Sequence, residues 1–106
     1  MGDIEIINIE NLNGKERKIA TKLLNEYYSK IQRLIKTPLS LRIHIKEYEK
    51  GGRRKKYSIN VEAVGSGKEF DSSSWDWDFA RAIHKTMIKI ENEIEHRFHS
   101  SEQHQK

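Results

Sequence analysis

The sequence contains no cysteine and only one proline among its 106 residues. Without cysteine the chain can form no disulfide, no zinc–thiolate site and no cysteine nucleophile. No apolar run approaches the roughly 20 residues that a membrane-spanning helix needs, and the N-terminus lacks the layout of a signal peptide. We therefore expect a soluble, cytoplasmic protein with no membrane partner.

Aromatic residues are also scarce, at 8%, whereas 34% of the residues are charged. The apolar fraction of 35% is enough for one core in a single domain. The net charge of +4 permits nucleic acid as a partner without requiring it, so the placement of the charges matters more than their sum. We expect one domain at residues 1–99, followed by a disordered polar tail at 100–106.

The longest periodic pattern runs from Trp75 to Phe98 and predicts an amphipathic helix. Ser74 is placed to cap its first turn, and Asp76 and Asp78 would complement the helix dipole. Apolar residues recur in steps of three or four, which is the spacing of one buried helical face. They are Phe79, Ile83, Met87, Ile90, Ile94 and Phe98.

A second helical pattern covers residues 15–36. Asn13 and Glu16 have the spacing of a capping box at its start. Thr37-Pro38 should end it, because a residue that precedes proline is disfavoured in helical conformation. Before this helix, residues 3–10 predict a short strand with a bulge near Ile6–Ile7.

Residues 39–49 alternate between apolar and polar side chains, as a half-buried antiparallel strand does. A turn at 50–52, a return strand at 57–63, a tight turn at 65–67 and a short strand at 68–71 follow. Together these elements predict a two-layer α+β fold of order β-α-β-β-β-α, with both helices on one face of a four-stranded sheet. The other face should be solvated and show Arg42, His44, Lys46, Ser58, Asn60 and Glu62.

Both predicted helices are basic on the side opposite their apolar stripe. Arg81, Lys85 and Lys89 follow one another at four-residue spacing, along about 12 Å of helix, and could match a row of phosphates. Two such helices side by side would form one positive groove. Residues 50–56 add a basic hairpin tip. Alternatively, the helix faces are simply solvated and balanced by glutamates, and the hairpin charges protect the exposed strands from aggregation.

Two pairs of ring-bearing residues lie outside these basic patterns. Trp75 and Trp77 are two residues apart and cannot both face the core, so we expect one to close the core's edge while the other could stack on a base or a partner. His96 and His99 lack a third ligand fixed by the sequence, and we expect no metal or cofactor. No nucleophile elbow or glycine-rich phosphate loop indicates an enzyme.

The last helix also carries a family pattern in Asp78, Ala82-Ile83 and Lys89-Ile90-Glu91. In these residues, and in its element order over about 3–98, the chain resembles the ribosome hibernation-promoting factors, or ribosome-associated inhibitors of translation. The resemblance implies a fold related to double-stranded-RNA-binding domains and binding to the small ribosomal subunit. His84 and the two tryptophans depart from the family pattern. Without the dimerisation extension of the long members, the short form is the closer comparison.

By position, the resemblance implies RNA contacts from both helices, and the outward strand and hairpin cations complete the candidate set. The predicted RNA-binding residues are Lys22, Lys30, Arg33, Arg42, Lys46, Arg53, Arg54, Lys55, Lys56, Arg81, Lys85 and Lys89. Two alternatives stay open: a protein-interaction module, or a homodimer that binds no nucleic acid. A double-stranded-RNA binder is disfavoured because Asp76 and Asp78 would repel phosphate where such proteins are basic.

Overall fold

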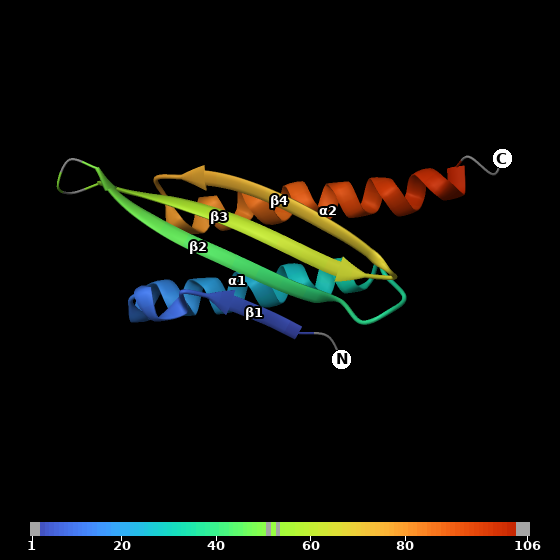
Figure 1. Cartoon of the computed structure of the whole chain (residues 1–106), viewed down its shortest axis with the longest axis horizontal. Helices are drawn as coiled ribbons and strands as arrows, with labels where there is room; N and C mark the ends of the chain where they lie inside the picture. Colours follow the sequence, from blue (N-terminus) through green and yellow to red (C-terminus); the bar gives the residue numbers. More distant parts are fainter. Residues whose placement is uncertain (1–2, 51, 53, 104–106) are drawn as a thin grey trace.

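The computed structural model describes residues 3–50, 52 and 54–103, with side chains described for 3–49, 52 and 54–98. Four strands and two long helices follow one another in the predicted order (Figure 1). A short 3-10 helix, η1, separates the first strand from the first helix. The elements are β1 (Asp3–Ile7), η1 (Ile9–Asn11), α1 (Gly14–Gln32), β2 (Ser40–Lys50), β3 (Arg54–Gly65), β4 (Lys68–Asp76) and α2 (Phe79–Gln103).

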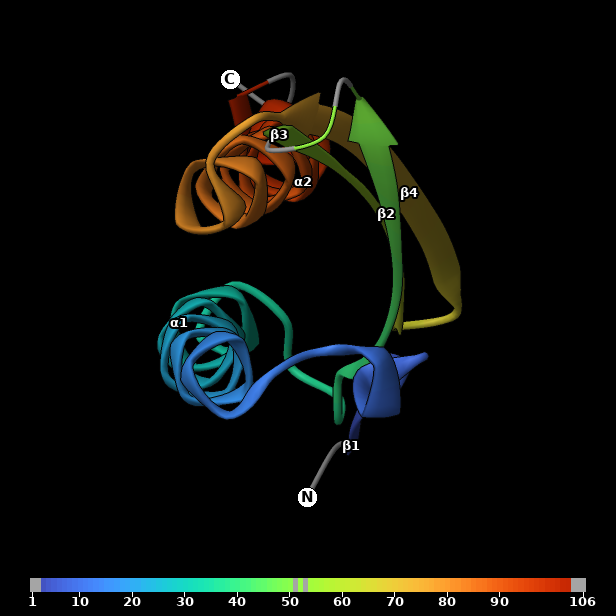
Figure 2. The same ribbon diagram turned by 90° about the vertical axis from the view of Figure 1, so that its left-hand side faces the viewer.

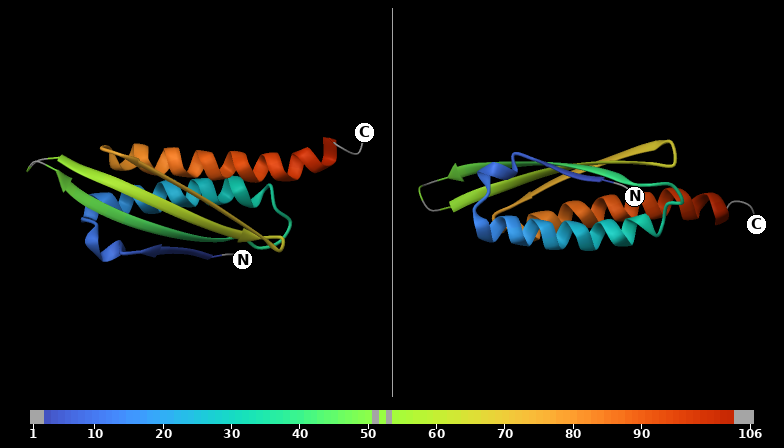
Figure 3. Two further views of the ribbon diagram at one scale, coloured as in Figure 1. Left: turned by 45° about the horizontal axis from the view of Figure 1, so that its top comes forward. Right: turned by 90° about the horizontal axis from the view of Figure 1, so that it is seen from below.

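The strands form one sheet in the order β1-β2-β3-β4, so every neighbour in space is also a neighbour in sequence. β1 pairs parallel to β2, and the other two pairings are antiparallel. The sheet curves around the helices, and both helices lie on its concave face (Figure 2). They run side by side in the same direction, and both begin near the β2–β3 hairpin (Figures 1 and 3). The predicted two-layer α+β fold is therefore confirmed.

The core lies between the sheet and the helices. The predicted inward residues of β2 and β3 are buried, including Ile43 and Val61, which are fully buried and directly paired. From α2, Ile83, Met87 and Ile90 are also fully buried, in agreement with the predicted apolar stripe. Both long helices cover the same face of the sheet, and neither covers the opposite face, which is open to solvent.

Helix α1 begins as predicted and ends earlier than predicted. Asn13 Oδ1 accepts from the Glu16 backbone N–H at 2.7 Å, and Glu16 Oε1 accepts from the Asn13 N–H at 3.1 Å. The helix stops at Gln32 instead of Lys36, because the Gln32 side chain bonds the following segment. Its Nε2 donates to the Thr37 carbonyl at 2.8 Å, and its Oε1 accepts from the Leu39 N–H at 2.9 Å.

The boundary between β4 and α2 differs from the prediction. β4 is longer than expected and runs from Lys68 to Asp76, with Trp75 paired to Ser58 of β3. Ser74 therefore lies within a strand and caps no helix. Instead, Asp78 caps the helix: its Oδ1 accepts from the Arg81 N–H at 2.8 Å, and α2 begins at the next residue, Phe79. The helical periodicity was extended too far towards the N-terminus because the alternation of β4 overlaps it.

The first strand and the last helix also differ from their predicted bounds. β1 ends at Ile7, and Asn8 adopts a left-handed conformation at φ 70°, after which Ile9 lies in η1 and not in the strand. The predicted bulge is thus replaced by a turn. At the other end, α2 continues to Gln103, and residues 104–106 lie outside the described part of the chain. The domain boundary at residue 99 stays a prediction.

Candidate nucleic-acid interface

The predicted cations of α1 lie on the solvent side of the helix. Lys22, Lys30 and Arg33 are all exposed. Lys30 Nζ is 5.2 Å from the centroid of the Tyr27 ring, and Tyr27 Oη is 2.6 Å from His84 Nδ1 on α2. Burial raises the pKa of Tyr27, and the nearby carboxylates of Glu91 and Glu26 raise it further. The contact between α1 and α2 therefore has both a cation, Lys30, and carboxylates close to it.

The basic row of α2 lies against the edge of β4. Lys85 Nζ donates to the Trp75 carbonyl at 2.7 Å, and Lys89 Nζ donates to the Ser73 carbonyl at 2.8 Å. β4 is an edge strand, so these ammonium groups cover backbone acceptors that the sheet leaves unpaired. His84 points towards α1, whereas the neighbouring Lys85 points towards β4. The two basic helix faces thus do not form the single groove that their periodicity suggested.

Asp76 lies next to this row and neutralises part of it. Its Oδ2 is 3.3 Å from Lys85 Nζ, and its Oδ1 is 3.7 Å from Arg81 Nη1. The hydrogen bond from the Asp78 backbone N–H to the carboxylate lowers the pKa of Asp76 most, with Lys85 and Arg81 adding to the effect. Asp76 is therefore ionised at neutral pH and holds the start of α2 to the end of β4.

The hairpin cations separate between the two faces of the sheet. Lys55 lies on the inner side, where its Nζ is 3.4 Å from Glu47 Oε1. Arg54 and Lys56 lie on the other side, over the rings of Trp77 and Trp75, at 4.2 and 4.5 Å from their centroids. Arg53 and the side chain of Lys50 lie outside the described residues. Two of the predicted hairpin contacts are thus available together on the open face.

Both tryptophans are partly exposed, at 46% for Trp75 and 38% for Trp77. Their rings meet edge to face, with centroids 5.8 Å apart. The expectation that one of them closes the core's edge was wrong, because both indoles are exposed and Trp75 lies on the outward side of β4. The alternation of residues 70–75 is the sequence signal that could have shown this. We name the group around them the aromatic–basic cluster: Lys46, Tyr48, Arg54, Lys56, Trp75, Trp77 and Lys85.

The opposite end of the open sheet face, towards the β3–β4 turn, is acidic. Arg42, one of the predicted RNA contacts, lies there with its Nε 3.2 Å from Glu5 Oε1 and with Glu62 opposite it in register. His44 Nε2 is 3.7 Å from Glu62. The exposed carboxylates of this acidic end are Asp3, Glu5, Glu62, Glu69 and Asp71. The structure therefore places Lys46 with the hairpin cations and Arg42 among carboxylates.

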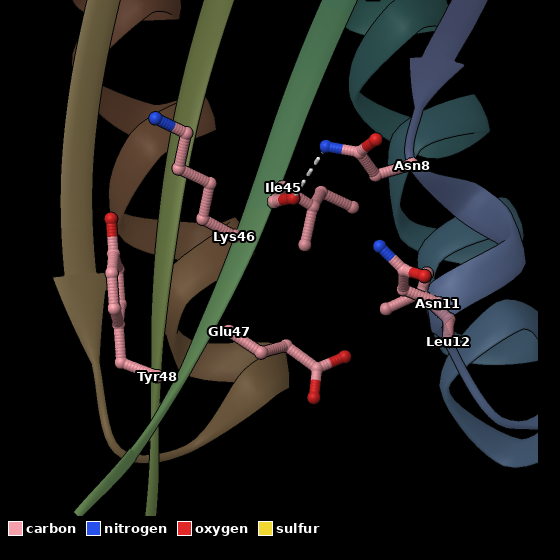
Figure 4. Close-up of a pocket in the computed structure, with 7 residues that line it drawn as sticks. All are labelled: Asn8, Asn11, Leu12, Ile45, Lys46, Glu47 and Tyr48. Carbon is pink, nitrogen blue, oxygen red and sulfur yellow. Dashed lines mark hydrogen bonds between the residues drawn. The ribbon is translucent and has the colours of Figure 1, made fainter.

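A pocket of about 370 Å³ lies between the end of β1 and the open edge of β2, next to the aromatic–basic cluster (Figure 4). Asn8 Nδ2 donates to the Ile45 carbonyl across it at 3.4 Å. Its polar lining consists of two amides, one ammonium group, one carboxylate and one phenol, and it contains no imidazole, serine or threonine. The lining residues are Asn8, Asn11, Leu12, Ile45, Lys46, Glu47 and Tyr48.

Two further properties concern metals and membranes. Within the described residues, no three side chains of His, Cys, Asp or Glu gather as metal ligands would. His96 is exposed, and the side chain of His99 lies outside the described residues. Neither α1 nor α2, as far as the structure describes them, combines the length and apolar character of a membrane-spanning helix.

Comparison with known proteins identifies the fold. No protein-family model matches the sequence, and no curated protein sequence matches it significantly. The structure is similar to that of the Thermus thermophilus Protein Y N-terminal domain, with a TM-score of 0.64 and 15% identity over 88% of this chain and 92% of that one.

A ribosomal subunit interface protein from Coxiella burnetii matches more weakly, with a TM-score of 0.49 and 13% identity over 89% of this chain and 93% of that one. At this distance the second match carries no weight. The likeness to the Protein Y domain shows a shared fold, and it agrees with the fold that the family resemblance implied.

Proposed function

We propose that this protein binds ribosomal RNA on the small ribosomal subunit and modulates translation by occupying that site, without catalysing a reaction. The observation that carries the proposal is the gathering of cations at one end of the domain. Lys85 from α2 and Arg54 and Lys56 from the hairpin lie beside two exposed tryptophans. Lys46 of β2 lies two strands from Trp75 on the same face, and the carboxylates of that face lie at its other end.

Two further observations support the proposal. The chain has the fold that its resemblance to the hibernation factors implies, and the Protein Y N-terminal domain shares that fold. The exposed Lys22 and Lys30 of α1, with Arg33 directly after the helix, add a second group of cations. Contacts of this kind read the shape and charge of folded RNA more than its sequence. A ribosomal partner would also place the protein in the cytoplasm.

The direct test is co-sedimentation of the protein with purified small ribosomal subunits across a series of salt concentrations. Binding through phosphates should weaken steeply with salt, because each neutralised phosphate releases counterions. The test variant replaces Lys46, Arg54 and Lys56 by Gln. We prefer these positions to Arg81, Lys85 and Lys89, because Lys85 and Lys89 also cover the β4 edge and their loss could alter the fold.

The matched control replaces Lys18, Lys36 and Lys68 by Gln, which removes the same charge outside the predicted set. We expect salt-sensitive binding for the wild type and the control, and a strong loss for the test variant. No binding at low salt would overturn the proposal. Salt-independent self-association would instead favour the homodimer alternative, because apolar contacts between copies are insensitive to salt.

A further inference from the structure

The aromatic–basic cluster has the features of a stacking surface. Trp75 lies on the outward face of β4 and is 46% exposed. Ser58 of β3 lies directly opposite it in register, and Lys46 of β2 lies opposite Ser58. A shallow hollow of about 270 Å³ lies on this part of the open face and is lined by Tyr48, Lys56, Ser58 and Trp75. Tyr48 lies two residues beyond Lys46 on β2, opposite Lys56 and diagonal to Ser58. Because β2 and β4 are about 10 Å apart and Ser58 is small, the space between Tyr48 and Trp75 can hold a flat group.

We propose that this hollow binds unpaired bases of single-stranded RNA, with Trp75 as the stacking residue and Lys46 and Lys56 as phosphate contacts. The proposal deepens the proposed function, on which it rests for its biological setting, by naming the form of RNA that the site takes. The Trp75 indole is 46% exposed, and it offers a stacking face when the Lys56 ammonium over its ring moves to a phosphate of the strand. A base inside a duplex is already stacked on its neighbours and gains nothing from such a face.

The charges around the hollow favour an anionic strand over a neutral partner. Lys56 Nζ lies 4.5 Å and Lys85 Nζ 5.6 Å from the centroid of the Trp75 ring, and of these two cations only Lys85 is paired with a carboxylate, that of Asp76. An RNA strand that places a base on Trp75 has its phosphates within reach of these ammonium groups. The carboxylates at the acidic end of the same face would repel the strand, which confines it to the hairpin end.

Intrinsic fluorescence gives a direct readout, because the sequence contains only two tryptophans and both lie in the cluster. The titrant is a twelve-residue oligouridylate, and the comparison is a duplex RNA with the same number of phosphates. We expect saturable quenching by the single strand and much weaker quenching by the duplex. Equal quenching by both would overturn the proposal, because phosphate contacts alone would then explain it.

Three variants identify the stacking residue by fluorescence anisotropy of the labelled oligouridylate. Trp75→Ala should bind about ten-fold more weakly or worse, which is the value of one stacked base. Trp75→Phe keeps a ring at the site and should retain most of the affinity. Val64→Ala, at the acidic end of the same face, serves as the control for removing an exposed apolar side chain and should bind like the wild type.

The outcomes separate this inference from the proposed function. Wild-type affinity in Trp75→Ala would sink the stacking proposal even if small subunits still bind. Quenching by the oligouridylate together with no binding to small subunits would sink the ribosomal proposal and leave the stacking site standing. No response to either RNA would overturn the stacking site, and an acidic peptide that quenches instead would identify a protein partner.

Discussion

The open sheet face has two ends on the same strands. The hairpin end lies beside the β2–β3 hairpin, and the turn end, which is the acidic end described above, lies beside the β3–β4 turn. Their side chains differ in kind. The hairpin end presents two tryptophans with Arg54 and Lys56 stacked over them. The turn end presents carboxylates, among which Arg42 is held by Glu5. Since the backbone is alike at both ends, we expect RNA binding by this fold to depend on which face and which end of the sheet each charge occupies.

Of the changes considered, reversing the charges at the hairpin end should have the largest effect on RNA affinity. Lys46→Glu with Lys56→Glu makes the hairpin end resemble the turn end, and we expect affinity for single-stranded RNA to fall on the order of 100-fold at low salt. The reciprocal change, Glu62→Lys with Glu69→Lys, should leave the affinity unchanged or raise it. Anisotropy of a labelled oligouridylate measures both, and equal losses in the two variants would show that the ends are not distinct.

The hairpin end is also held more firmly from within. Tyr57 Oη donates to Glu16 Oε2 at 2.7 Å, a buried bond that joins β3 to the start of α1. Burial raises the pKa of Tyr57, and the bond to Glu16 raises it further, so the phenol is neutral and donates across the ordinary pH range. At the turn end, Thr37 Oγ1 accepts from the Ser66 N–H at 2.6 Å in an exposed position.

Removing one hydroxyl at each end therefore has unequal effects. Tyr57→Phe should lower the free energy of unfolding by about 1–3 kcal/mol, because Oε2 of the buried Glu16 carboxylate loses its hydrogen bond. Thr37→Val should cost only about 0.5–1 kcal/mol, since water can replace the exposed bond. Urea denaturation measures both changes. A larger loss of stability for Thr37→Val than for Tyr57→Phe would contradict the claim that the hairpin end is held more firmly.

The smallest effect concerns the pH dependence of stability. Because the pKa of Asp76 is lower in the folded than in the unfolded chain, its contribution is present above the unfolded pKa and is lost as pH falls through the folded pKa. The stability advantage of the wild type over Asp76→Asn should thus shrink as the pH is lowered below about 4. Urea denaturation of both proteins at pH 6 and at pH 2.5 measures this advantage. An advantage that is independent of pH would show that the ionised Asp76 carboxylate does not stabilise the fold.

The fold was largely predictable from sequence, because it follows from local patterns. The alternation of residues 39–49, the capping box of Asn13 and Glu16 and the apolar stripe of α2 each specify an element directly. The β4–α2 boundary was not predictable in this way. Ser74 fits both a strand and a helix cap, and only the pairing of β4 with β3 decides between them.

The candidate site was predictable only as a list of cations. Lys85 and Lys89 have helical spacing, but their bonds to the Trp75 and Ser73 carbonyls depend on where the edge of β4 lies in space. Similarly, Arg42 and Lys46 are equivalent in the sequence pattern and lie at opposite ends of the charge distribution in the fold. The β2–β3 hairpin, β4 and α2 come together around Trp75 only in the folded structure, so the periodicity of the sequence could not predict this cluster.

Lysine modification of the free and subunit-bound protein, read by mass spectrometry, tests the hairpin end as the RNA-binding surface most directly. Each lysine is compared with itself in the free protein, so differences in intrinsic exposure cancel. Binding at the hairpin end predicts protection of Lys46, Lys56 and Lys85 by small ribosomal subunits, with Lys36 and Lys68 still reactive. Protection of Lys36 and Lys68 with no change at the hairpin end would contradict it.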